Sequence, residues 1–143
     1  MDIAAFVPLS VSPIDSLSDE INKVRLDTAQ IVAEQIIPNE ELLGNYEDPR
    51  RDAFVYEIKN LIREAGLWAP HLPREYGGMG IGFLGHAYMN EILAWSPYSN
   101  PLFGVVAPNS GNESLLVKYD RGTEKTVAGT PDSWRASVVF LDD

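Results

Sequence analysis

The side chains of this sequence that could carry acid–base or metal chemistry are few. The chain of 143 residues contains two histidines, His71 and His86, and no cysteine. Without carboxylates at a metal-ligand spacing, two histidines do not form a metal site, so we expect each to be a surface or loop histidine. Glu75 and Glu91 are the carboxylates that invite a catalytic interpretation. The pattern itself predicts no metal site and assigns no catalytic residue.

The glycine-rich stretch at residues 66–82 is the second feature with a possible chemical role. Gly78, Gly80 and Gly82 alternate with other residues, as in some loops that bind phosphate. However, no buried strand precedes them and no Lys-Ser or Lys-Thr pair follows, so the phosphate-binding interpretation fails. The stretch also contains more large apolar side chains than a spacer needs. We therefore predict a loop that packs onto a core through Leu67, Trp68, Leu72, Tyr76 and Met79.

A helix is predicted on the N-terminal side of this loop, over residues 51–65. Its apolar side chains recur at helical spacing, and Gly66 follows at the position where a left-handed cap ends a helix. Pro70 and Pro73 prevent the helix from continuing. Because the loop must fold back onto its neighbouring helices, we predict one buried cluster that contains Leu61, Trp68, Tyr76 and Ile92.

An earlier helix is predicted to begin after Ser18, whose hydroxyl can cap it, with Asp19 and Glu20 at the positive end of the helix dipole. Pro38 is predicted to end this helix. An acidic connector then occupies residues 39–49. The stripe that we expect to face the core consists of Ile21, Val24, Thr28, Ile31, Val32 and Gln35.

Three more helical segments follow the glycine loop in this prediction. Residues 83–95 are apolar on nearly every side, so this helix is placed at the centre of the bundle. One of its faces is expected to carry Leu84, Tyr88, Ile92 and Trp95. Asn100 and Pro101 have the signature of an N-cap and first helical residue, opening a short helix through Ala107, and Asn112 caps a last turn or two. Five helical segments without alternating strand patterns predict an all-α bundle.

The order of these motifs resembles the acyl-CoA dehydrogenase family. Members of the family read a helix end, Gly-Leu, then Pro-x-Glu-Tyr-Gly-Gly-x-Gly, and a helix that ends in Glu-x-x-Ala. This chain has Gly-Leu at residues 66–67, Pro-Arg-Glu-Tyr-Gly-Gly-Met-Gly at residues 73–80, and Glu-Ile-Leu-Ala at residues 91–94. The resemblance implies that residues 18–119 are the helical N-terminal domain of that fold.

Enzymes of this family dehydrogenate acyl-CoA thioesters: a carboxylate removes the α-proton, and the β-hydrogen leaves as hydride to FAD. The resemblance therefore implies acyl-CoA as substrate and FAD as cofactor. Residues 107–119 look most like a branch of the family active on long or unusual acyl chains. Glu75 and Glu91 match structural positions, where we expect cap and inter-helix contacts rather than catalysis. The residues that match one wall of the family's acyl pocket are Leu102, Phe103, Val105, Val106 and Asn109. Each of them could equally be an ordinary core residue.

The resemblance weakens toward the C-terminus. The family's Trp-Leu helix, flavin-contacting β-domain strand and glutamate base have no counterpart in this chain. A one-nucleotide shift in a permitted coding sequence for residues 124–143 restores segments that resemble the Trp-Leu and Ser-Met-Thr-Glu motifs. We therefore hypothesise an out-of-frame, poorly packed tail at residues 120–143. The arm at residues 1–17 is likewise expected to be extended or disordered.

Composition and charge limit which partners and which cellular compartments we expect for this protein. A formal net charge of −10 disfavours nucleic acid, which requires clustered Lys and Arg. No apolar run reaches the roughly 20 residues needed to cross a bilayer. The N-terminus has no basic residue before Lys23, which argues against a secretory signal and a mitochondrial presequence. We expect an intracellular, soluble protein, cytoplasmic by default, with a mitochondrial or peroxisomal location still open.

Three functional hypotheses follow. The first is a truncated N-terminal fragment of a flavin-dependent acyl-CoA dehydrogenase, inactive alone and holding FAD weakly or not at all. The second is a non-enzymatic helical module that pairs with its own kind or with an intact relative. The third is a helical domain with no connection to acyl-CoA. A purified protein that retained yellow flavin would favour the first hypothesis over the others.

Overall fold

The computed structural model describes residues 9–106 together with Leu115 and Lys118. All regular elements in this part of the chain are helical, which confirms the predicted all-α fold. The predicted tail at residues 120–143, and nearly all of the last helix predicted from Asn112, lie outside the described residues. The α-helices are α1 (Asp19–Ile31), α2 (Glu40–Gly44), α3 (Arg51–Glu64), α4 (Gly82–Leu93) and α5 (Ser99–Leu102).

Helix α1 begins where local chemistry predicts. Ser18 Oγ accepts a hydrogen bond from the backbone N–H of Ile21 at 3.3 Å, and Asp19 and Glu20 occupy the first turn. The hydroxyl thus satisfies one of the N–H groups that a helix leaves unpaired at its start. Thr28, on the predicted inward stripe, is fully buried. Both the cap and this part of the stripe are confirmed.

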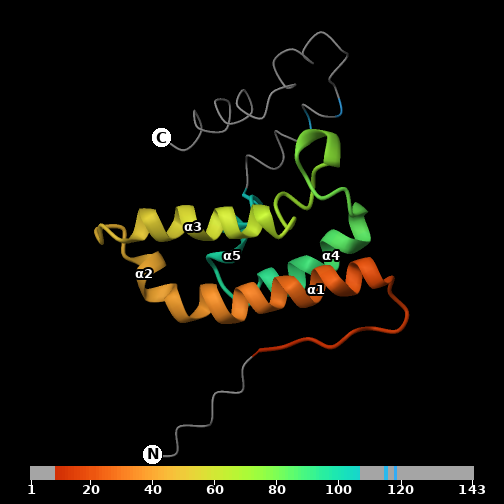
Figure 1. The fold of residues 1–143 in the computed structure, drawn as a ribbon, viewed down its shortest axis with the longest axis horizontal. Coiled ribbons are helices and arrows are strands. Elements are labelled where there is room, and N and C mark those ends of the chain that lie inside the picture. The colour runs from red at the N-terminus through yellow and green to blue at the C-terminus, as the bar shows by residue number, and fades with distance from the viewer. Residues whose placement is uncertain (1–8, 107–114, 116–117, 119–143) are drawn as a thin grey trace, which may run out of the picture.

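Asn22 fastens the segment that precedes α1. Its Oδ1 accepts from the N–H of Ile14 at 2.8 Å, and its Nδ2 donates to the carbonyl of Ile14 at 3.0 Å. Arg25 Nη1 donates to the carbonyl of Ser12 at 2.8 Å. Residues 9–17 consequently run back along the outside of α1 before the chain turns into it (Figure 1).

Pro38 does not end the first helix, contrary to the prediction. The chain continues through a π-helical turn (η1, Val32–Ile36) and a 3₁₀ turn (η2, Ile37–Asn39) into α2. Pro38 lies in the first turn of η2, where a backbone N–H would have no partner within the helix, so the N–H that proline lacks is not missed. The side chain of Asn39 donates to the carbonyl of Gln35 at 2.8 Å and so satisfies a group near the irregularity. The connector before α3 is therefore shorter than predicted.

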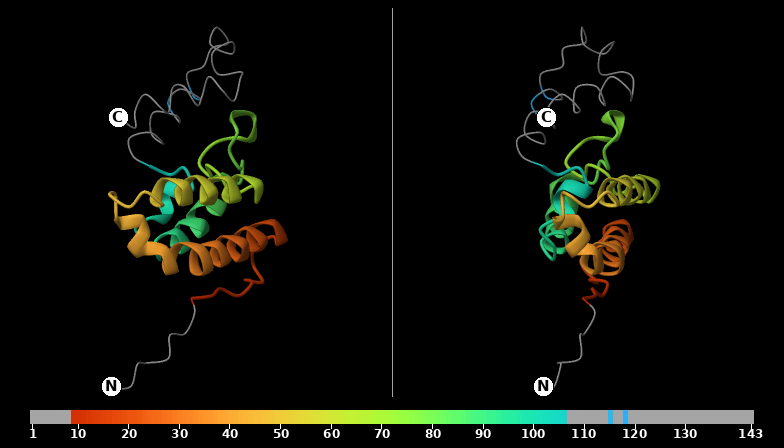
Figure 2. Two further views of the ribbon diagram at one scale, coloured as in Figure 1. Left: turned by 60° about the vertical axis from the view of Figure 1, so that its left-hand side comes forward. Right: turned by 90° about the vertical axis from the view of Figure 1, so that its left-hand side faces the viewer.

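The helices form a small bundle with a shared core. The long unit of α1, η1, η2 and α2 runs antiparallel to α3 and joins it at the α2 end (Figure 1). Helix α4 packs mainly against α1, and α5 packs against α3. Figure 2 shows α4 and α5 together on one side of the pair formed by α1 and α3. Apolar side chains from all these helices meet between them.

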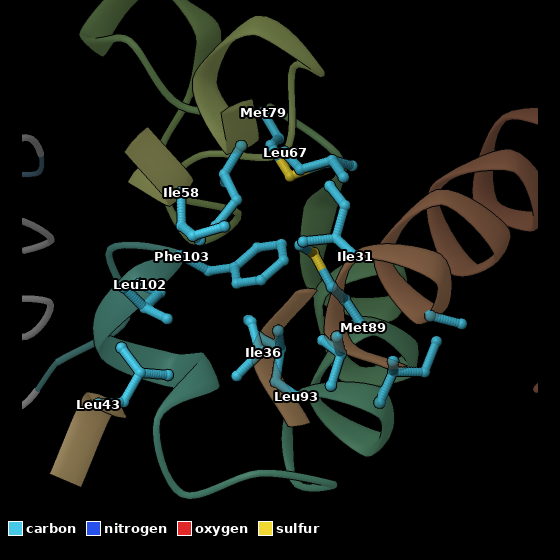
Figure 3. Close-up of a cluster of buried hydrophobic side chains, with 14 residues drawn as sticks. Ile31, Ile36, Leu43, Ile58, Leu67, Met79, Met89, Leu93, Leu102 and Phe103 are labelled. Atoms are coloured by element: carbon cyan, nitrogen blue, oxygen red, sulfur yellow. The ribbon is translucent and has the colours of Figure 1, made fainter. Parts of the chain in front are cut away.

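Phe103, directly after α5, lies at the middle of that core (Figure 3) and is fully buried. A buried aromatic ring contributes a large apolar area, so this residue is a main contact between the two sides of the bundle. The rest of the buried cluster consists of Ala29, Ile31, Val32, Ile36, Leu43, Ile58, Ile62, Leu67, Met79, Met89, Ile92, Leu93 and Leu102.

Helices α3 and α4 bury some, but not all, of the side chains that were predicted to face the core. On α3, Ile62 is fully buried but Leu61 is 40% exposed, so Leu61 does not join the predicted cluster. On α4, Phe83 is 90% and Leu84 is 55% exposed, so this helix is not surrounded by protein at its start. Where a helix is apolar around most of its circumference, the neighbouring helix decides which face is buried. The buried face of α4 consists of Gly85, Met89, Ile92 and Leu93.

Helix α5 starts earlier and ends sooner than predicted. It begins at Ser99 after the N-cap Tyr98, so Pro101 lies in the first turn, where no N–H donor is needed. Gly104 follows it with a positive φ of 77°, a conformation that ends the helix before Ala107. No helix in the described part of the chain is long and apolar enough to span a membrane.

Candidate functional site

The glycine loop begins with the helix cap that the sequence predicts. Gly66 has a φ of 73°, and its N–H donates to the carbonyl of Arg63 at 3.0 Å. The N–H of Leu67 donates to the carbonyl of Ile62, also at 3.0 Å. These two bonds form a Schellman motif, which satisfies carbonyls at the end of α3. The motif turns Leu67 directly into the core, where it is 2% exposed.

Backbone hydrogen bonds fold the rest of the loop onto itself. The amide of Gly78 donates to the carbonyl of Pro73 at 3.1 Å, and that of Gly80 donates to the carbonyl of Leu72 at 3.0 Å. A Cβ at Gly78 would lie 2.2 Å from the Leu72 carbonyl oxygen, so only glycine fits there. The loop is therefore a compact structural unit whose glycines permit close backbone contact.

The five positions predicted to line an acyl pocket divide into three groups. Leu102 is 3% exposed and Phe103 is fully buried, so both belong to the core. Val105 and Val106 are half-buried and follow Gly104 on the surface side of the core. Asn109 lies outside the described residues. Among the described positions, Val105 and Val106 are the ones whose side chains are partly open to a ligand.

Trp68 lies beside this segment, a contact that sequence reasoning missed. A Cβ at Gly104 would lie 2.9 Å from Cε2 and Cζ2 of the indole, so the ring rests against the Gly104 backbone. The Arg63 guanidinium stands over the indole ring, with its central carbon 4.0 Å from the ring centroid. The amide of Ala69 donates to the carbonyl of Phe103 at 2.9 Å and fastens the loop there.

This contact had one sequence signal, the glycine at position 104 within an otherwise apolar run. Trp68 and Tyr76 are half-buried instead of fully buried, while Ile92 is 2% exposed. The predicted cluster is thus correct for Ile92 and partly correct for Trp68, which packs against the buried cluster, whereas Tyr76 does not belong to it. The indole extends the apolar surface formed by Val105 and Val106.

His71 and His86, treated separately in the sequence analysis, lie next to each other. Their ring centroids are 6.2 Å apart and the ring planes are inclined by 39°. Burial lowers the pKa of His86, and the neighbouring His71 lowers it further, while a hydrogen bond with Asn90 opposes the change. In the described part of the chain, no group of three or more His, Asp and Glu side chains could hold a metal ion.

Glu75 and Glu91 are both exposed and, within residues 9–106, neither carboxylate makes a hydrogen bond or ion pair. The expected cap and inter-helix contacts are therefore not formed there. Arg74 makes that kind of contact instead. Its Nη2 lies 2.9 Å from Glu20 Oε1 on α1, and its Nε donates to the carbonyl of Met79 at 3.1 Å. Arg74 thus connects the glycine loop to the start of α1.

The described architecture is that of an all-α domain with a compact glycine loop, beyond whose contact with Gly104 the half-buried Val105 and Val106 follow. The family described as acyl-CoA dehydrogenase, N-terminal domain, matches residues 18–124. The chain belongs to this family, and the resemblance recognised from the glycine loop is confirmed.

Acyl-CoA dehydrogenase family member 10 of Mus musculus is a similar protein. It is 27% identical over 129 residues, which cover 84% of this chain and 12% of the mouse protein. The chain thus spans about an eighth of the length of that relative. No solved structure matches the chain.

Proposed function

We propose that this chain is the N-terminal part of an FAD-dependent acyl-CoA dehydrogenase and contributes one wall of its acyl-chain pocket. The observation that carries the proposal is the partly open apolar surface of Val105 and Val106, backed by Phe103 and bordered by Trp68. Family membership supplies the substrate class, an acyl-CoA thioester. An apolar wall stabilises an acyl chain by removing its methylene groups from water, worth about 0.8 kcal/mol per buried CH₂.

The glycine loop does not offer free amides for the phosphates of a flavin dinucleotide. A flavin dinucleotide needs backbone or side-chain donors for its phosphates, and the glycine loop is the obvious source of free amides. The amides of Gly77, Gly78, Met79 and Gly80 already donate to carbonyls within the loop, at 3.0 to 3.3 Å. Because these donors are used, we assign no flavin contact to the loop and derive no reaction step through the cofactor.

The described residues also leave the dehydrogenation without its base. FAD, when bound, would supply the hydride acceptor of the family's reaction, and a carboxylate would be needed to take the α-proton. Such a reaction needs its groups within about 3–3.5 Å of one another. Glu75 and Glu91 are exposed, and both match positions that the family resemblance assigns to structural roles. The role left to this chain is to bind and orient the acyl chain and to exclude water from one side.

The test is to purify the 143-residue chain, add FAD, and assay reduction of an artificial electron acceptor with acyl-CoA of several chain lengths. We expect no turnover above a flavin-only blank and little retained flavin absorbance. A longer protein, in which residues 1–119 continue in frame into a flavin domain, serves as the positive control. Turnover by the 143-residue chain alone would contradict the proposed division of roles.

The second candidate function is a non-enzymatic module that pairs with an intact relative or with its own kind. The exposed Phe83 and Leu84 on α4, with Tyr56 and Leu61 on α3, favour it, since large exposed apolar side chains often mark contact surfaces. Light scattering of the pure chain, alone and mixed with an intact family member, measures such pairing. A monomer in both samples would contradict this second function.

A further inference from the structure

The histidine pair joins two elements that are held together mainly by apolar packing. His71 belongs to the glycine loop and His86 to α4, and their rings lie 6.2 Å apart. The chain contains no other histidine. Any change of state that depends on histidine protonation therefore arises at this one contact.

The surroundings of His86 favour a neutral ring. His86 Nε2 is buried and, within the described residues, has no hydrogen-bond partner, so a proton placed there would lack an acceptor. A second positive charge on the neighbouring imidazole would repel the first. Burial and the proximity of His71 lower the pKa of His86, in agreement with this geometry.

Within the described residues, no carboxylate acts on His86 to offset such a charge. From α1, Arg25 stands over Tyr88 of α4, with its guanidinium carbon 5.8 Å from the ring centroid. Arg74 of the loop is paired with Glu20 of α1. The remaining carboxylates on the loop and on α4, Glu75 and Glu91, are exposed, and the described residues give them no ionic partner.

We propose that the His71–His86 contact is an acid-sensitive clasp, which lets the glycine loop pack on α4 while the His86 ring is neutral and weakens that packing when His86 is protonated. The proposal is independent of the acyl-CoA function, because it concerns the docking of the loop. Histidine suits this role since its charge changes between about pH 5 and 8.

The direction in which pH changes the stability of the loop follows from the difference in proton binding between the folded and unfolded states. The folded protein binds the His86 proton less readily than the unfolded chain, whose histidine pKa is about 6.5. The stabilising contribution of the neutral pair is therefore complete above that pH and is lost as the pH falls through the lower, folded value. Loss of the clasp loosens the loop, which carries Trp68 and its contact with Gly104.

The first experiment follows the ring signals of His71 and His86 by NMR during a pH titration of the full chain. We expect His86 to titrate below the ordinary histidine range, and the His71→Gln variant to raise the midpoint of His86. An ordinary midpoint for His86 in the wild-type chain, together with no shift in the variant, would overturn the proposal. The Glu91→Gln variant is the control, because it changes an exposed charge on the same helix without touching the pair.

The second experiment measures the loop itself, by hydrogen exchange at the amides of Leu72 and Gly80 at pH 7.5 and 5.5. After correction for the intrinsic pH dependence of exchange, the equilibrium constant for opening should increase at the lower pH by at most about tenfold, because pH 5.5 lies about one unit below the unfolded histidine pKa of about 6.5. The increase should shrink in His71→Gln and disappear in the double variant with His86→Gln. An equal increase in the wild-type chain and in His71→Gln, which retains one histidine and a polar side chain, would overturn the clasp.

Discussion

The link at residues 45–50 and the glycine loop at residues 66–82 both connect helices, but they are stabilised in different ways. The link closes through local polar contacts: Asp48 Oδ1 accepts from the N–H of Arg50 at 2.9 Å, and the two side chains form an ion pair at 2.6 Å. The glycine loop is held by apolar burial, because it places in the core Leu67, Ala69, Leu72 and Met79.

Turn-forming residues alone do not distinguish the two connections, since both contain them. Large side chains show the difference: Tyr46 in the link is 77% exposed and lies under the Arg51 guanidinium, whereas Leu67 in the loop is 2% exposed. A buried loop shares its stability with the whole bundle, while an exposed link depends on its own few contacts. Substitutions should therefore affect the two connections very differently.

The largest expected effect is at Leu67. Replacing Leu67 by Ala should destabilise the protein by about 2–5 kcal/mol, because a buried side chain is lost and a cavity remains. Tyr46→Ala in the link is the matched control and should change stability by less than about 0.5 kcal/mol. Urea unfolding of both variants measures the difference, and similar losses in the two would remove the contrast between the connections.

Adjacent glycines in the loop should differ from each other. Gly78→Ala should cost about 1–3 kcal/mol, because the new Cβ would meet the backbone oxygen of Leu72. Gly77 has a φ of 82° and open space around it, so Gly77→Ala should cost about 1 kcal/mol from backbone strain alone. Thermal unfolding ranks the two, and an equal or reversed order would show that the close contact at Gly78 relaxes freely.

The helix that leads into the loop permits a sharper test of which face is buried. Leu61→Ala should cost less than about 1 kcal/mol, because this side chain is 40% exposed. Ile62→Ala, one position further, should cost about 2–5 kcal/mol, because it is fully buried. If Leu61→Ala proved the more damaging in urea unfolding, the orientation of α3 would have to be revised.

Arg74 should contribute little to stability, although it connects the loop to α1. Its ion pair with Glu20 is mostly exposed, and exposed pairs are worth about 0–1 kcal/mol. Arg74→Ala should therefore lower stability by at most about 1 kcal/mol, with a smaller loss at high salt. A much larger loss in urea unfolding would mean that polar contacts, and not apolar burial, hold the loop.

The smallest expected effect is confined to the link. Hydrogen bonds from Arg50 lower the pKa of Asp48 from 3.8 to about 2. Because the folded value is the lower one, the contribution of this contact is present above about pH 3.8 and is lost as the pH falls toward 2. Arg50→Gln should return the Asp48 pKa toward about 3.9, as measured by NMR of the carboxyl carbon. Chemical shifts of the glycine loop should stay unchanged, and a change there would couple the two connections.

Local signals in the sequence predicted the ends of elements well. The cap at Ser18, the helix Arg51–Glu64 and the left-handed Gly66 are all confirmed. Each depends on hydrogen bonds between residues within about five positions of one another, so nearby sequence is sufficient. Family membership was recognisable for a related reason, since the glycine loop is a contiguous motif.

Predictions that needed knowledge of a neighbour were less successful. Pro38 was expected to end a helix, but the chain continues in a helical form through η2 and α2. Leu61 and Leu84 were expected inside and are exposed. On helices with apolar residues on several sides, spacing identifies the candidates for burial and leaves the choice of face to packing.

The sequence by itself determined the all-α class, the main helix ends and the apolar character of the glycine loop, because propensity, capping and burial preference act within short stretches of chain. Only the tertiary structure decided which side chains share a surface. It placed Trp68 against Gly104 and brought His71 beside His86, by folding the loop back onto α4 and onto the segment after α5. Such contacts between distant residues depend on how the whole core packs, and no local pattern specifies that arrangement.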